Sequence, residues 1–431
     1  MQHATGASKP FIWDVVVIGG GASGLSAALA AARAGSSVAV LENDVACGLS
    51  VLATGNGRCN LSNIDLNPKH YLHPDIAKQV MGQDAEQNVA SFMDSIGVVV
   101  RAEEDRLYPA TFRAESVRDA LLSACTREQV KLLPCHNTVD AEPLPWGNGW
   151  HLIVETPGSK LHVKSRTDRK ANLRALRRAL IDAPKRRVSV EAHHVILAAG
   201  GSSSLVELFE LPSIPVKPVL CPVAADIPLV PNAFANLCGQ RARAGITLIR
   251  NNRPIWNETG EVQFRAYGIS GIVSFDLSRR IGNDDTVLID LFPEYTCEQL
   301  FEVLKNRSKS IGCASFTETD WFDGMLTREL TAIVLAAARS LRIDAHDLCR
   351  LANLLKGIEL SVRGTAEEAS AQVSRGGISF DCVDLETLGI LPSVAPALSA
   401  CGEALDMDAD SGGFNLAWAW LSGIRAGAHC L

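Results

Sequence analysis

The sequence lacks any long apolar run. No stretch of its 431 residues approaches the roughly 18 uninterrupted apolar residues of a membrane-spanning helix. The first residues, MQHATGASKPFIW, also lack the charged start and apolar run of a secretory signal. We therefore expect no membrane association and a cytoplasmic location.

Paired metal ligands are also missing. The twelve cysteines are scattered and include no Cys-x-x-Cys pair, which argues against a zinc site or a dithiol redox centre. We expect no metal, and free thiols that are mostly buried. A net charge of −7 gives no overall attraction to nucleic acid. The length exceeds the roughly 250–300 residues of one core, so at least two domains are expected.

What is present begins with a βαβ pattern. Asp14–Ile18 (DVVVI) is a short apolar run typical of a strand buried on both faces. GGGASG follows and leads into LSAALAAARAG, an Ala/Leu-rich helix that ends at Gly35. The next apolar run, SVAVLE, predicts a second strand ending at Glu42.

The glycines of this unit predict a dinucleotide site, because the Gly-x-Gly-x-x-Gly pattern follows a strand and opens a helix. Gly19 permits the tight turn, Gly21 lets the backbone approach a pyrophosphate, and Gly24 brings the helix against the strand. Glu42 would accept hydrogen bonds from an adenosine ribose and disfavours NADP. The predicted contacts are Gly19, Gly21, Ala22, Ser23, Gly24, Glu42 and Asn43.

The C-terminal region favours FAD over NAD. CGEALD, at Cys401–Asp406, precedes GGFN and the helix LAWAWLSGIRAGAHC. An acidic, glycine-rich loop that feeds a helix start suits the ribityl chain and the flavin ring, where negative charge gathers on reduction. The alternative is a capped helix that merely closes the sheet. The predicted contacts here are Ala199, Gly200, Gly402, Glu403, Asp406, Gly412, Gly413, Phe414 and Asn415.

The sequence pattern between these two regions changes twice. Helical patterns at 75–96 and 115–125 alternate with short apolar runs at 98–101 and 106–108, and residues 150–155 and 161–163 resemble a hairpin. From Pro212, repeated prolines and the strand-like runs ARAGITLIR and GIVSFDL suggest an all-β module. Helices at about 296–350 interrupt that module, and a strand at 358–362 returns to it.

Four segments resemble one family of flavoproteins. TGNGRCNLSN at 54–63 is the most specific; HVILAAGG at 194–201, YGISG at 267–271 and GEALDMDADSGGFNLAWAWLSG at 402–423 agree with it. Together they resemble the YhiN-like FAD-binding proteins, also called BaiN-like or aminoacetone-oxidase-family proteins. The resemblance implies that Gly55, Asn56, Gly57 and Arg58 lie along the cofactor, and that the segment around Glu403, Asp406 and Gly412–Asn415 closes over the flavin.

The resemblance also implies an α/β fold: a Rossmann-type two-dinucleotide-binding FAD domain with an inserted β-barrel-like domain and a small helical domain. On the sequence pattern, the FAD domain takes residues 1–204 and 369–431, the barrel-like domain 205–295 with a return strand in 351–368, and the helical domain 296–350.

One apparent insertion departs from that family. Lys164–Arg187 holds ten lysines and arginines against Asp168 and Asp182, and Leu173, Leu176 and Leu180 share one face of its expected helix. Such a helix could bind RNA phosphates. The alternative is a solvent-exposed surface helix with no ligand, because the segment has no aromatic residues that could stack on bases. A second departure follows LAAGG, where many family members carry a longer glycine-rich segment and this chain continues with SSSLVELFELPSIPVKP.

The catalytic residues are less well defined. We expect Arg58, Tyr108 and Tyr267 to be the candidates, since a tyrosine hydroxyl could donate a proton opposite hydride delivery. The alternatives are a structural ion pair for Arg58 and a packing role for each tyrosine. No second Gly-x-Gly-x-x-Gly follows a strand, so NADH or NADPH would reach the flavin only transiently.

Three functions fit these observations. The first is hydride transfer from reduced flavin to an activated C=C bond, which the resemblance suggests for small molecules and, in some members, for a uracil of ribosomal RNA. The second is an aminoacetone-type amine oxidase whose flavin is reoxidised by O₂. The third is an RNA- or partner-binding protein with structural FAD. The oligomeric state is not determined by the sequence.

Overall fold

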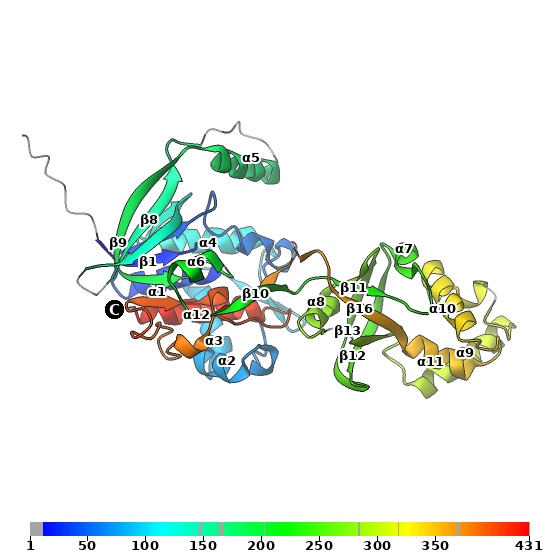
Figure 1. Cartoon of the computed structure of the whole chain (residues 1–431). Coiled ribbons are helices and arrows are strands. Elements are labelled where there is room, and N and C mark those ends of the chain that lie inside the picture. Colours follow the sequence, from blue (N-terminus) through cyan, green and yellow to red (C-terminus); the bar gives the residue numbers. More distant parts are fainter. Residues whose placement is uncertain are drawn as a thin grey trace, which may run out of the picture. The chain divides into compact units, whose positions relative to one another are not determined.

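The protein is described by a computed structural model over residues 12–145, 149–161, 163, 168–201, 203–282, 285–317, 319–368 and 371–430. The chain divides into two compact units (Figure 1). Unit 1 consists of Met1–Lys217 with Val373–Leu431, and unit 2 of Pro218–Gln372. Within the described residues no helix has the length and apolarity that a bilayer crossing requires. All twelve cysteines are free thiols, and seven of them are buried.

A seven-stranded sheet forms the centre of unit 1. Its order is β6-β2-β1-β9-β8-β7, with β18 paired to β9. The valines of β1 are fully buried because both faces of the sheet are covered. The strands are β1 (Ile12–Ile18), β2 (Val38–Glu42), β6 (Lys131–Pro134), β7 (Asn137–Pro143), β8 (Trp150–Pro157), β9 (Lys185–Leu197) and β18 (Leu398–Ala400).

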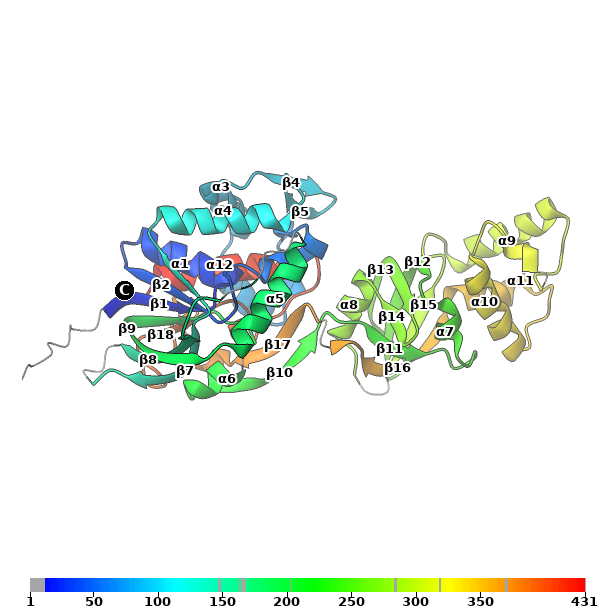
Figure 2. The ribbon, with the colours of Figure 1, turned by 90° about the horizontal axis from the view of Figure 1, so that it is seen from above.

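Two helices from opposite ends of the chain pack side by side in unit 1 (Figure 2). A Cβ at Gly423 would lie 2.4 Å from the Ser23 oxygen, and one at Gly427 would lie 2.1 Å from the Ala27 oxygen. Only glycine permits this approach, so α12 (Phe414–Ala428) lies directly on α1 (Ala22–Arg33). The helices run in the same direction, since residues four apart in one meet residues four apart in the other.

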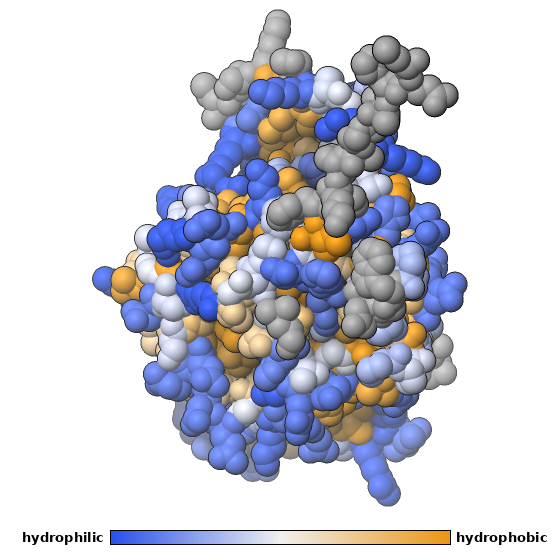
Figure 3. Space-filling view, turned by 90° about the vertical axis from the view of Figure 1, so that its left-hand side faces the viewer, coloured by the Kyte–Doolittle hydropathy of each residue, from blue (hydrophilic) through white to orange (hydrophobic). Residues whose placement is uncertain are grey.

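Smaller elements complete unit 1. The strands β3, β5 and β4 form a separate three-stranded sheet, and β10 pairs with β17 where the chain leaves unit 1 and returns to it. The smaller elements of unit 1 are α2 (Pro74–Met81), α3 (Ala85–Ile96), α4 (Ala114–Arg127), α6 (Ser203–Leu208), β3 (Ser62–Asn63), β4 (Val100–Glu103), β5 (Arg106–Pro109), β10 (Ser213–Val219) and β17 (Val373–Ile378). The face shown in Figure 3 is largely hydrophilic, with apolar side chains gathered in hollows.

The predicted hairpin of residues 150–155 with 161–163 is wrong. β8 pairs instead with β7 and with β9, and the β8–β9 register runs from Trp150–Ala192 to Pro157–Lys185. Leu161 and Val163 lie outside any strand. The helix of the basic insertion, α5 (Arg169–Asp182), therefore lies in the β8–β9 connection (Figure 1), and Lys185–Arg187 are the first residues of β9. Residues 164–167 of the insertion lie outside the described residues.

Unit 2 is a closed six-stranded barrel joined to helices, as the family resemblance implies. Barrel and helices share one apolar core that includes the fully buried Phe316, Trp321 and Phe322. Its strands are β11 (Val223–Asp226), β12 (Arg241–Arg250), β13 (Arg253–Arg265), β14 (Gly268–Ser270), β15 (Thr286–Asp290) and β16 (Ile358–Thr365). Its helices are α7 (Ala233–Leu237), α8 (Ile272–Ser278), α9 (Cys297–Ile311), α10 (Arg328–Ser340) and α11 (Leu348–Lys356).

The strand expected for GIVSFDL is a helix, α8. Its alternating apolar residues suggested period two, yet Val273 and Leu277 are four apart and both buried, which is also the spacing of a helical face. Gly271, at φ +101°, turns the chain out of β14. The Ser274 hydroxyl donates to the Ile269 carbonyl at 3.0 Å and fixes the first turn of the helix.

Candidate cofactor site

The glycine turn after β1 has the geometry that its sequence predicts. Gly19 has φ +110°, and a Cβ at Gly24 would lie 1.9 Å from the Gly19 carbonyl oxygen, so a side chain fits at neither position. Gly21 is the N-cap of α1, and no side chain caps this helix end. The first backbone N–H groups of α1, at Ala22 and Ser23, are therefore available to an anion.

The acid at the end of β2 lies against this turn. One Glu42 carboxylate oxygen accepts a hydrogen bond from the Gly20 N–H at 2.8 Å, and the other accepts from the Asp44 N–H, also at 2.8 Å. Because the Glu42 carboxylate is fixed beside the glycine turn, it suits a ribose next to a pyrophosphate bound there.

A loop with several left-handed residues forms the next part of the site. Gly55 and Asn56 both have φ +54°, and Gly57 has φ +83°. A Cβ at Gly55 would lie 2.8 Å from the Asn60 nitrogen, so the loop turns tightly onto Asn60. The Asn60 side-chain oxygen is buried and finds no hydrogen-bond partner among the described residues. A buried acceptor without a donor is costly, and a hydroxyl of a bound cofactor would satisfy it.

The same loop is fixed to the start of α12. The Asn63 side-chain amide donates to the Gly412 carbonyl at 3.1 Å, and the Trp420 indole N–H donates to the Leu61 carbonyl at 3.0 Å. A Cβ at Gly413 would lie 2.4 Å from the Ser62 oxygen. Gly413 is the N-cap of α12, which has no side-chain cap either.

Two uncapped helix N-termini therefore lie in one region of unit 1. Since Gly423 lies on Ser23, and Phe414 precedes Gly423 by nine residues, α12 begins about 13 Å before this crossing point at a rise of 1.5 Å per residue. Both helix starts point the same way. This spacing fits an extended dinucleotide, with its pyrophosphate at α1 and its flavin end at α12.

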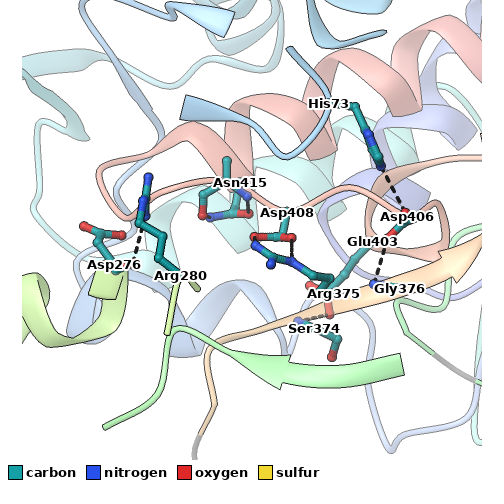
Figure 4. Close-up of polar contacts among 11 residues, drawn as sticks. His73, Asp276, Arg280, Ser374, Arg375, Gly376, Glu403, Asp406, Asp408 and Asn415 are labelled. Carbon is teal, nitrogen blue, oxygen red and sulfur yellow. Dashed lines mark hydrogen bonds and ion pairs between the residues drawn. The ribbon is translucent and has the colours of Figure 1, made fainter. Parts of the chain in front are cut away.

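The acidic segment between β18 and α12 is tied to β17 (Figure 4). Glu403 accepts from the Ser374 N–H and Asp406 from the Gly376 N–H, both at 2.9 Å. The guanidinium of Arg375 donates two hydrogen bonds, at 2.6 and 3.0 Å, to the fully buried Asp408. Burial raises the pKa of Glu403 above its usual range. Glu403 and Asp406, predicted as ribityl ligands, thus also hold the neighbouring strand.

Other side chains close this segment. Asn415, a predicted cofactor residue, accepts from the Ala409 N–H and donates to the Ala409 carbonyl, both at 2.9 Å. His73 pairs with Asp406 at 3.0 Å. His70 stacks on Phe414 with ring centres 4.3 Å apart and also pairs with Asp410. These histidines could not be found from the sequence because each lies more than 300 residues from its acid.

The predicted catalytic residues are distributed over both units. Arg58 forms an ion pair with Glu103 and lies 4.3 Å above the ring of Tyr108, which is buried. Tyr267 belongs to unit 2, where burial and a hydrogen bond with Glu367 raise the pKa of Tyr267 to about 12. The structure thus brings Arg58 and Tyr108 together.

The remaining predicted cofactor residues lie in two further turns of unit 1. Ala199 and Gly200 follow the carboxyl end of β9, and Gly200 has φ +65°. Gly402, at φ +64°, closely approaches Ser23 of α1. Over the described ranges, no group of three or more His, Cys, Asp or Glu side chains is arranged to hold a metal ion.

The Rossmann-type sheet, the glycine turn and the comparisons with known proteins define an FAD-dependent oxidoreductase. The chain belongs to the HI0933-like family: its Rossmann-domain description matches residues 13–143, and its barrel and H2TH-domain description matches residues 217–373. These two matches cover more than half of the chain. The expected resemblance to YhiN-like flavoproteins and the choice of FAD are thereby confirmed.

Three relatives match nearly the full length. The chain is 29% identical to the 3-dehydro-bile acid delta(4,6)-reductase of Clostridium scindens, over 95% of this chain and 97% of that protein. It is 22% identical to the ribosomal RNA dihydrouridine synthases of Haemophilus influenzae and Escherichia coli. These two alignments cover 94% and 95% of this chain, and 96% of each relative.

Proposed function

We propose that this protein reduces a C=C bond conjugated to a carbonyl group. The two uncapped helix N-termini of unit 1, one for the pyrophosphate and one for the flavin end, are the observation that carries the proposal. The named relatives support it, because a 3-oxo-4,6-diene and a uracil ring each hold a C=C bond conjugated to a carbonyl group.

The chain's own residues would bind and orient the reactants. The turn Gly19–Gly24 would hold the pyrophosphate, Glu42 with Asn43 the adenosine ribose, and Gly55–Arg58 the stretch between pyrophosphate and ring. Gly402–Asp406 and Gly412–Asn415 would enclose the flavin end, where the dipole of α12 stabilises negative charge. When bound, reduced FAD would supply a hydride to the β-carbon of the substrate.

Tyr108 is the proposed proton donor. It belongs to unit 1, as do the glycine turn and the start of α12, and its ring lies 4.3 Å from the guanidinium carbon of Arg58. Its hydroxyl can deliver the proton that the α-carbon requires. Tyr108→Phe should lower turnover at least tenfold and leave FAD content unchanged. Tyr295→Phe, in unit 2 and 40% exposed, is the control. Equal turnover by wild type and Tyr108→Phe would reject this role.

The function is tested with purified enzyme under anaerobic conditions. NADH or NADPH is added, and the reduced protein is then mixed with a panel of conjugated enones, including 4-en-3-one and 4,6-dien-3-one steroids. We expect enone-dependent return of the oxidised-flavin spectrum. Return of that spectrum only on admission of air, together with oxidation of an amine such as aminoacetone, would favour the oxidase instead.

An RNA substrate is the second candidate, favoured by the outer side of α5. Lys170, Arg174 and Arg178 repeat every four residues, are exposed, and form no ion pair within the described part of the chain. RNA affinity that falls linearly with salt on a log–log plot, and falls further in the triple alanine variant, would support recruitment through α5. Equal RNA binding by the wild type and the triple variant would reject it.

A further inference from the structure

Helix α5 is attached to the predicted adenosine end of the cofactor site. Arg177 of α5 donates to both carboxylate oxygens of Asp44, with Nε at 3.0 Å from each and Nη2 at 2.5 Å from Oδ2. Asp44 follows the ribose acid by two residues, and its backbone N–H donates to Glu42. A continuous chain of hydrogen bonds therefore runs from α5 to Glu42.

One side of α5 carries its leucines. At 100° per residue, Arg169, Leu173, Leu176 and Leu180 lie on that side, and Arg177 flanks them. The three leucines are half-buried, whereas the four arginines of the helix are exposed. Arg169 lies 3.9 Å from Glu115 of α4, so an ion pair between exposed side chains lies on the same side as the leucines.

The charges at this corner favour a cation. Glu42 and Asp44 place two carboxylates on one short loop, and like charges this close in sequence repel each other. A bidentate guanidinium is the side chain best suited to offset that repulsion. The hydrogen bond with Asp44 raises the pKa of Arg177 further, so its charge is constant at every physiological pH.

We propose that α5 is a cap on the adenosine half of FAD. Arg177 is a positioning residue that holds Glu42 through Asp44, and the leucine side of the helix covers the adenine ring. Helix α5 is thus part of the cofactor site on its leucine side, whatever binds its other side. The proposal concerns cofactor binding alone and does not depend on which substrate the flavin reduces.

A comparison of FAD with FMN binding tests this role, because FMN lacks the adenosine half that α5 would cover. Apoprotein is titrated with each cofactor for wild type, Arg177→Ala and the neighbouring control Arg178→Ala. We expect Arg177→Ala to raise the dissociation constant for FAD about five- to tenfold, as for loss of a partly exposed, bidentate ion pair. FMN binding should not change, and Arg178→Ala should match wild type for both cofactors.

Hydrogen exchange of the unmodified protein is the second measurement. FAD and AMP should each slow amide exchange in Arg169–Asp182, whereas FMN should not. The double variant Asp44→Arg/Arg177→Asp should recover at least half of the lost FAD affinity. The proposal would be overturned if Arg177→Ala weakened the binding of FAD and FMN equally. It would also be overturned if FAD did not slow amide exchange in α5.

Discussion

Gly21 and Gly24 occupy the same turn, yet their substitution should have different consequences. A Cβ at Gly21 would meet only the Ser50 hydroxyl, at 3.1 Å, so Gly21→Val should fold and obstruct the pyrophosphate. A Cβ at Gly24 would collide with the Gly19 carbonyl at 1.9 Å, so Gly24→Ala should lower the free energy of unfolding by about 2–4 kcal/mol.

Thermal unfolding of the apoproteins and FAD titration separate the two effects. Gly21→Val should retain the melting temperature of the wild-type apoprotein and lose at least tenfold in FAD affinity, whereas Gly24→Ala should melt earlier. Ser50→Ala is the control for the contact at Gly21 and should resemble wild type. Normal FAD content in Gly21→Val would count against the pyrophosphate site.

His194 makes stability depend on pH at the β9–β18 pairing. Burial lowers the pKa of His194 from 6.5 to about 4, and the ring lies 2.7 Å from the Ser399 hydroxyl. Between pH 7 and pH 5 the unfolded chain takes up a proton at this position and the folded protein does not. The free energy of unfolding should therefore fall by about 2 kcal/mol over this interval.

Urea denaturation at several pH values checks this contribution. His194→Gln retains a polar side chain that does not titrate, so its stability should change less between pH 7 and pH 5 than that of the wild type. Parallel pH profiles for the two proteins would show that another group causes the loss.

At the scale of the element, the crossing of α1 and α12 fixes the distance between the two helix starts. Gly427→Ala would place a Cβ 2.1 Å from the Ala27 carbonyl oxygen, and the helices would have to separate. We expect a loss of about 2–4 kcal/mol in unfolding free energy and weaker FAD binding, because the N-terminus of α12 moves with the helix.

The control for this helix is Ala428→Val, at an exposed position beside Gly427. Differential scanning calorimetry and FAD titration of both variants measure the outcome. Ala428→Val should stay within about 0.5 kcal/mol of wild type. If Gly427→Ala matched Ala428→Val in both stability and FAD affinity, the close contact between α1 and α12 would not position the site.

Elements with a strong local pattern were predictable from sequence. The run VVV of β1 and the Ala-rich helix α1 carry their own periodicity, and both appear where expected. Strand β6 was missed because KLLP is short and pairs with β2, which is distant in sequence. Strand β7 was missed because NTVDAEP is largely polar, although its partner β8 follows closely in the chain. The 161–163 hairpin was wrong because the strand that pairs with β8 on its other side, β9, begins only after α5.

At the scale of the whole molecule, unit 2 is inserted between two paired strands of unit 1. β10 and β17 lie together where the chain leaves and returns. Replacing Pro218–Gln372 by a short Gly/Ser turn should preserve FAD binding, since the glycine turn, Glu42 and α12 all belong to unit 1.

Flavin absorbance and circular dichroism of the trimmed protein test this division. Unit 2 expressed alone should fold because barrel and helices share their own core, and it should bind no flavin. A trimmed unit 1 that folds but cannot bind FAD would show that unit 2 contributes to the cofactor site.

The cofactor site was predictable where its residues are close in sequence. Gly19–Gly24 and Glu42 lie within one βαβ unit, whose geometry follows from its pattern. The pairing of His73 with Asp406, and of Arg375 with Asp408, depends on how the two ends of the chain pack together. The predictions for Glu403 and Asp406 therefore omitted the strand that both acids hold.

A single anaerobic turnover tests the central claim most directly. Enzyme reduced by one equivalent of NAD(P)H is mixed with a conjugated enone, and the flavin spectrum and the product are followed together. The account predicts that one saturated ketone forms for each FAD oxidised and that no product forms in the Gly21→Val protein. Flavin that stays reduced with every enone and every uridine-containing RNA, and is reoxidised only by oxygen, would contradict it.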